Sequence, residues 1–156
     1  MTGWQATLTI DYTRAAERTV AKFAHEGPLR VLQSLYPEGD LVCHNVLVHP
    51  PSGLVGGDTL DIRLHVGENA HALLTTPGAT RFYRSEQGLA TQQVAAHVGD
   101  GARLEWLPLE TIAYNGCHGL NHAVFDLAST AEMVAWDITA LGLPNANLPF
   151  ERGQLQ

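Results

Sequence analysis

The sequence predicts an all-β fold, a β-helix-like or layered β-sheet scaffold in which short strands stack upon one another. Three observations predict it. Apolar and polar residues alternate over several short stretches, glycine and proline separate these stretches, and one strand-turn pattern recurs along the chain. No stretch of ten or more residues has the apolar stripe of an amphipathic helix.

The first strand is expected at residues 4–12, where the residues on one side are all apolar or aromatic: Trp4, Ala6, Leu8, Ile10 and Tyr12. The other strands expected in the first half are bounded by turn-forming residues and cover residues 19–25, 29–36, 41–48 and 59–66. These runs are short, as strands in sandwiches, barrels and solenoids usually are.

A repeated pattern follows in three later segments, residues 67–77, 99–108 and 128–138. In each, a small or turn-forming cluster precedes an alanine and then an alternating run. The three alanines are Ala70, Ala102 and Ala131, and their spacing is about 30 residues, a period typical of stacked repeats. The pattern favours the strand-turn units of a β-solenoid or layered sheet, and ordinary β-hairpins are the alternative.

Composition limits the possible partners. The 156 residues fit a single domain, residues 1–156, and only 16% of them are charged, fewer than the usual quarter. Part of the surface is therefore expected to meet a partner. The net charge of −7 and the single lysine, Lys22, argue against binding to nucleic acid or to an anionic membrane, whereas metal cations are compatible.

The cysteines and the N-terminus predict a cytoplasmic protein. Two cysteines, Cys43 and Cys117, form no disulfide framework and are expected to be reduced thiols. No apolar run has the length of a signal peptide or a membrane span.

The stretch LVHPPSGLVGGDTLD, residues 47–61, has an unusual composition. Its two prolines fix φ and remove backbone donors, and its glycines permit positive φ, so we expect an irregular backbone. Asp58 ends the glycine pair. Two interpretations remain open: Asp58 caps the amides of a tight turn, or the turn presents its carboxylate to a ligand.

The histidines and cysteines show no established metal motif. Eight histidines occur, without HExxH or a close HxH pair. Two thiol and imidazole clusters have ligands suited to nickel, zinc or copper, but neither offers a complete tetrahedral set: Cys43, His44 and His49, and Cys117, His118 and His122. Glycines 116 and 119 predict a loop around His118.

Motifs for nucleophilic catalysis and nucleotide binding are missing from the sequence. It has no GxSxG elbow, GxxxxGK[ST] loop or GxGxxG fingerprint, so the chain is not expected to hydrolyse nucleotides. A second unusual stretch, TTPGATRFYRS at residues 75–85, places two aromatic and two guanidinium groups together in Arg81, Phe82, Tyr83 and Arg84. These side chains are either interface anchors or a strand with one buried aromatic and two exposed arginines.

Four segments in the same order resemble the urease accessory protein family UreD, also called UreH. They are HEGPLRVLQSLYPEG (25–39), HPPSGLVGGD (49–58), TTPGATRFYRS (75–85) and LEWLPLETIAYNG (104–116). Together they cover most of the chain. Relatives of this family continue beyond the last residue here, so the resemblance implies the N-terminal portion of a UreD protein.

The resemblance implies a non-enzymatic scaffold with a β-helix-like architecture. Such proteins bind urease apoprotein and UreF, which recruits the GTPase UreG, and the accessory complex can contain more than one copy of the scaffold. They hold no tight cofactor and deliver nickel, a transient cargo, through an internal passage. A passage needs weak ligands such as isolated carboxylates and hydroxyls, so that the metal is released.

The matching motifs place candidate residues on this passage. Asp58, in the GGD motif, is the first candidate for its wall. The weaker candidates lie in neighbouring matching segments: Thr59, Asp61, Thr75 and Thr80. The group Arg81, Phe82, Tyr83 and Arg84 is expected to maintain the passage or to form a partner face. Two alternatives remain: a β-rich interaction module without a metal role, and a metal-dependent hydrolase that uses Asp58, His44 and His49.

Overall fold

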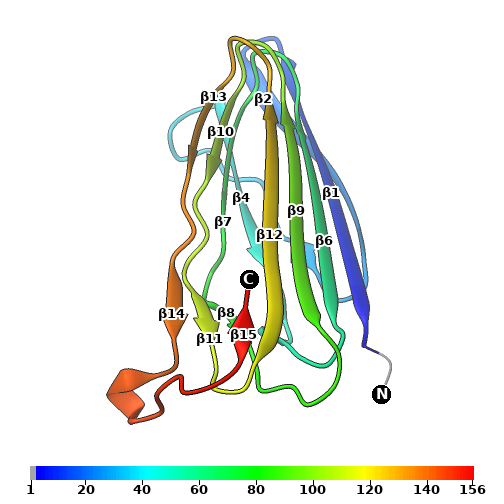
Figure 1. Cartoon of the computed structure of the whole chain (residues 1–156). Coiled ribbons are helices and arrows are strands. Elements are labelled where there is room, and N and C mark those ends of the chain that lie inside the picture. Colours follow the sequence, from blue (N-terminus) through cyan, green and yellow to red (C-terminus); the bar gives the residue numbers. More distant parts are fainter. Residues whose placement is uncertain (1–2) are drawn as a thin grey trace.

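The computed structural model describes residues 3–156, which form three sheets and a single short 3-10 turn, η1 (Pro144–Ala146) (Figure 1). The first sheet has the order β15 (Gln154–Leu155), β12 (His118–Leu127), β9 (Ala90–Val98), β6 (Thr59–Val66), β1 (Gln5–Ala15) and β2 (Arg18–Glu26). The second has the order β13 (Glu132–Ala135), β10 (Arg103–Trp106), β7 (His71–Thr75), β4 (Val42–Val48) and β3 (Arg30–Val31). The third has the order β14 (Thr139–Leu141), β11 (Thr111–Ala113), β8 (Thr80–Phe82) and β5 (Gly53–Leu54).

The chain winds as a β-solenoid. From β4 onward it passes through the second, third and first sheets in turn, and equivalent strands of successive turns pair in parallel. The six-stranded sheet forms one wall, and the two shorter sheets lie end to end in the opposite wall (Figure 1). At the first turn, β1 runs parallel to β6 and antiparallel to β2. The predicted all-β, β-helix-like architecture is therefore confirmed.

The repeated alanines mark the same turn in successive layers. In each layer the alanine amide donates to the carbonyl three residues earlier, over 3.0, 3.1 and 3.1 Å, in the pairs Ala70 and Gly67, Ala102 and Gly99, Ala131 and Ala128. The strands that follow these turns, β7, β10 and β13, are parallel neighbours. The repeat predicted from the sequence is thus real, and the hairpin alternative does not apply to these segments.

The core lies between the walls. The predicted apolar side of the first strand faces inward, with Ala6, Leu8, Ile10 and Tyr12 at most 1% exposed. Their parallel neighbours on β6 continue the same columns, and Leu60, Ile62, Leu64 and Val66 are also buried. Alternation along each strand and exact register between strands therefore build the core together.

Residues 29–36 differ from the expected strand. Only Arg30–Val31 forms a strand there, with an isolated bridge at Leu35. The rest is held as a loop by side chains: the Tyr36 hydroxyl donates to the Thr19 carbonyl over 2.9 Å, and the Arg18 guanidinium lies 4.0 Å from the Tyr36 ring centre. These tertiary contacts fix a segment that has few strand partners.

The loop expected around His118 is wrong, because β12 begins there. Gly119 lies within the strand and pairs with Ala90. A Cβ at Gly119 would lie 2.4 Å from Cδ1 of Phe82 and 2.9 Å from Leu155, so this glycine makes room for close packing. Gly116 does lie in a turn, with φ 81°, whereas Gly119 marks a close approach between the walls.

Candidate functional site

A cavity of about 240 Å³, partly open to solvent, lies between the two walls and is lined by residues from successive turns of the solenoid. Its apolar lining comes mainly from the core columns. Its polar lining contains hydroxyl, amide, imidazole and carboxylate groups, from His49, Thr76, Thr80, Gln92, Thr111, Asn121 and Asp137. These side chains offer nitrogen and oxygen atoms that can bind a polar molecule or a metal ion.

Three of these side chains form a ladder along the solenoid. Gln92 Nε2 donates to Asn121 Oδ1 over 3.0 Å, and Asn121 Nδ2 donates to Asp137 Oδ2 over 2.8 Å. Gln92 and Asn121 occupy the same inward column of the first sheet as Ala6 on β1 and Leu60 on β6. The column is therefore apolar at the first turn and polar in the later ones.

The third sheet contributes hydroxyl groups to the cavity. Thr80 on β8 and Thr111 on β11 are parallel neighbours, and Thr111 is only 4% exposed. A hydroxyl offers one donor and two lone pairs, so each can bind a polar ligand reversibly. Among the residues proposed from the sequence for the passage wall, Thr80 lines this cavity.

His49 follows β4 and lies beside both the cavity and the Trp4 ring, whose centre is 5.0 Å away. Its Nε2 is buried and has no hydrogen-bond partner among residues 3–156. Burial lowers the pKa of His49, and the nearby charge of Asp58 partly opposes this effect. A neutral imidazole with a free ring nitrogen therefore borders the cavity.

We expect His49 to make stability depend on pH. Its pKa is lowered by folding from the ordinary 6.5, so the unfolded chain takes up the proton at higher pH. Stability attributable to His49 is therefore complete above the unfolded pKa and is lost as the pH falls below it toward the folded pKa. His49→Gln should weaken the loss of unfolding free energy between about pH 7.5 and 5.5, measured by urea unfolding. Exposed His25→Gln is the control, and equal slopes for the two variants would contradict the expectation.

Asp58 is built into the turn that precedes β6. Its Oδ1 accepts from the Trp4 amide over 3.2 Å and its Oδ2 from the Val55 amide over 3.0 Å, and the residue is 5% exposed. The irregular backbone expected here is present, with positive φ at Ser52, Gly56 and Gly57. Asp58 thus caps local amides and lies next to His49 rather than on the cavity lining itself.

The stretch at residues 75–85 is divided between the core and the surface. Phe82 is fully buried, Tyr83 packs against Tyr114 at 5.0 Å between ring centres, and Arg84 pairs with Glu86 at 2.7 Å. Two other polar side chains of the stretch are tied to neighbouring turns, with Arg81 Nη1 donating to Ser52 Oγ over 3.2 Å and Thr75 Oγ1 donating to the Leu107 carbonyl over 2.8 Å. Phe82 is the one buried aromatic of the expected strand, but of the two arginines expected to be exposed only Arg84 is, because Arg81 is half-buried.

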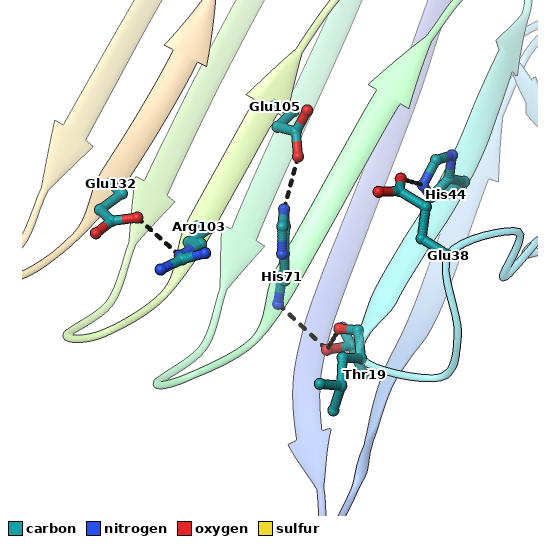
Figure 2. A network of polar contacts seen from close by, with 8 residues as sticks. Thr19, Glu38, His44, His71, Arg103, Glu105 and Glu132 are labelled. Carbon is teal, nitrogen blue, oxygen red and sulfur yellow. Dashed lines mark hydrogen bonds and ion pairs between the residues drawn. The ribbon is translucent and has the colours of Figure 1, made fainter.

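Two histidines on the outer face of the second sheet are each paired with a glutamate (Figure 2). His44 Nε2 lies 2.7 Å from Glu38 Oε1, and His71 Nε2 lies 2.7 Å from Glu105 Oε1. Within the described residues, no three His, Cys, Asp or Glu side chains gather so as to hold a metal ion. The set Asp58, His44 and His49 is therefore not assembled into a hydrolase centre in this structure.

The motifs recognised in the sequence did not reveal most of the polar residues that line the cavity. Gln92, Asn121 and Asp137 belong to no recognisable pattern in the sequence. The signal that could have found two of them is the repeat itself, because the spacing that aligns Ala70 with its later counterparts also aligns Leu60 with Gln92 and Asn121. Polar residues at inward positions of a repeat indicate a polar interior.

Stacked parallel turns around a partly polar cavity define the class of the protein, a β-solenoid with a cavity between its walls. No helix within residues 3–156 has the length and apolar character needed to cross a membrane. The profile of the family described as UreD urease accessory protein matches residues 5–156. The chain belongs to this family.

Curated relatives agree with the family match. Urease accessory protein UreD of Variovorax paradoxus (strain S110) is 62% identical over 150 residues, which cover 96% of this chain and 54% of the relative. The proteins of the same description from Albidiferax ferrireducens and Leptothrix cholodnii are 62% and 55% identical, and each is covered over 55% of its length. The chain thus spans about half the length of the curated relatives it matches.

Proposed function

We propose that this chain acts in urease maturation as part of a cytoplasmic scaffold that delivers nickel, and that its internal cavity forms part of the nickel passage. The observation that supports this most directly is the polar lining of a cavity that extends across successive turns. Membership of the urease accessory family supports the same role. No tightly bound cofactor is proposed, and nickel is the transient cargo.

The chemistry of the lining suits transfer better than storage. Imidazole nitrogen and hydroxyl, amide and carboxylate oxygens can each replace part of the hydration shell of Ni²⁺, and no complete ligand cage occurs among the described residues. The net charge of −7 favours the approach of a cation. Thr80, Thr111 and Asn121 are the proposed wall residues, and Asp58 is proposed to hold the turn that positions His49.

The proposed partners are urease apoprotein, UreF and, through UreF, UreG. The exposed side of residues 75–85 supplies a candidate face, since Arg84 is exposed and Tyr83 is half-buried against Tyr114. Arginine and tyrosine are enriched among the residues that dominate binding energy at interfaces. Phe82 supports this face from the core.

The test is urease activation on co-expression with UreF, UreG and urease apoprotein. Thr111→Val and Asn121→Leu remove polar groups from the cavity with little change in volume, and we expect the double variant to lower nickel-dependent urease activity about tenfold or more while UreF still co-purifies. The matched control is Thr9→Val, the same hydroxyl-to-methyl change at an exposed position of β1.

Full activation by the double variant would overturn the passage proposal. If UreF binding also persisted and only Tyr83→Ala abolished activation, the alternative of an interaction module without a metal role would be favoured. That alternative rests on the packing of Tyr83 against Tyr114 at the surface.

A further inference from the structure

A row of four titratable side chains crosses the outer face of the first sheet. Asp11 on β1, His65 on β6, His97 on β9 and Asp126 on β12 occupy directly paired positions on four adjacent parallel strands. All four are exposed. The row lies on the opposite face of the sheet from the cavity, because the inward neighbours of the two histidines, Leu64, Val66, Ala96 and Val98, are buried.

The two imidazoles lie face to face in the centre of this row. Their ring centres are 5.6 Å apart and their planes differ by only 5°. A carboxylate flanks each ring on its outer side, with His65 Nδ1 3.7 Å from Asp11 Oδ1 and His97 Nδ1 3.0 Å from Asp126 Oδ2. The order is therefore carboxylate, imidazole, imidazole, carboxylate.

This order determines which ring nitrogens are free. A carboxylate accepts from Nδ1–H and so favours the tautomer whose Nε2 has a lone pair. The same carboxylate–imidazole arrangement orients metal-binding histidines in many proteins and raises their basicity. Asp126 lies within hydrogen-bond distance of His97 Nδ1 and so leaves His97 Nε2 free for a ligand. His65 lies 3.7 Å from Asp11, beyond hydrogen-bond distance, and its exposed ring on the neighbouring strand can present either nitrogen.

We propose that His65 and His97 form a surface site for a divalent transition-metal ion of the nickel, zinc and copper group. Paired strands lie about 4.8 Å apart, which is close enough for two histidines to bind one metal at about 2.1 Å. The lone pairs of the parallel rings do not converge as they stand, so metal binding requires the exposed rings to rotate out of their stacked arrangement. Imidazole suits these metals and disfavours Mg²⁺ and Ca²⁺, which prefer oxygen.

Asp126 acts as a positioning residue for this site through its contact with His97 Nδ1, and water completes the coordination. With two protein nitrogens and open access, the bound metal exchanges readily. The site does not depend on the proposed passage, because it lies outside the cavity and binds metal in the chain alone.

The first test uses the full wild-type chain and Ni²⁺ as the probe. In nuclear magnetic resonance spectra of the histidine rings, substoichiometric Ni²⁺ should broaden the signals of His65 and His97 first, because broadening falls steeply with distance from the paramagnetic ion. Mg²⁺ at the same concentration should leave them unchanged. Equal broadening of all eight histidines would overturn the proposal.

The second test compares variants by calorimetric titration with Ni²⁺. His65→Ala and His97→Ala should each weaken binding at this site about tenfold or more, and the double variant should be no weaker than either single variant, because each removes the chelate. Asp126→Asn should weaken binding by about tenfold while the protein stays folded. His25→Ala, a change at an exposed histidine of β2, is the control, and a loss of affinity equal to that of His97→Ala would refute the assignment.

Discussion

Replacement of Asp58 by alanine should lower the free energy of unfolding by about 2–4 kcal/mol, because two backbone amides lose a charged acceptor at a nearly buried position. The Trp4 amide immediately precedes β1 and the Val55 amide lies in the turn before β6, so one carboxylate ties together two segments far apart in the sequence. Urea unfolding monitored by circular dichroism measures the change.

Two further variants make the Asp58 result specific. Asp58→Asn keeps one oxygen acceptor and should lose less stability than the alanine variant. Asp61→Ala removes a carboxylate that pairs with Arg63 at the surface, and it should cost less than about 1 kcal/mol. Equal stability of Asp58→Ala and Asp61→Ala would contradict the capping role. Urease activation by Asp58→Ala must be compared at equal amounts of folded protein.

Replacement of Phe82 by alanine should have the other large effect, a loss of about 3–5 kcal/mol, because its fully buried ring is removed from the contact between the walls. Phe82 packs into space left by Gly119 on the facing sheet, so the variant leaves a cavity that neighbouring backbone cannot fill. The unfolding midpoint in urea reports the change.

The matched control for Phe82 is Phe23→Ala on β2, where the ring is 38% exposed. The same atoms are deleted, but less apolar surface returns to water, so the loss should be clearly smaller. The core assignment would be contradicted if Phe82→Ala had the unfolding midpoint of the wild type and yet lost partner binding. Phe82 would then belong to an interface.

The fold could be predicted from the sequence where one structural requirement, such as alternation along a strand, applies to several residues together. Strict alternation identified β1 and β6, and the recurring alanines identified the stacked turns, because parallel pairing in register repeats the same local requirements in each layer. Gly119 misled the prediction because its role depends on Phe82, a contact between distant segments that local sequence cannot reveal.

The candidate site was less predictable. Motif resemblance pointed to Asp58 and Thr80, of which Thr80 lines the cavity and Asp58 caps a turn beside it. Asn121 and Asp137 come together only through the winding of the chain, since their hydrogen bond joins the first sheet to the segment between β13 and β14. A polar side chain on a strand indicates a cavity only when the inward face is already known.

The turn shared by Ala70, Ala102 and Ala131 has a consequence for how the family can vary. The connection from the long strand to the alanine has the same length in each layer, whereas the connections at the other end of the solenoid differ, as the link between β8 and β9 and that between β11 and β12 show. We expect insertions and deletions to be tolerated better at the end where the connections already differ in length. In this chain the connections of variable length lie at one end, and the constant turns at the opposite end keep the layers in register.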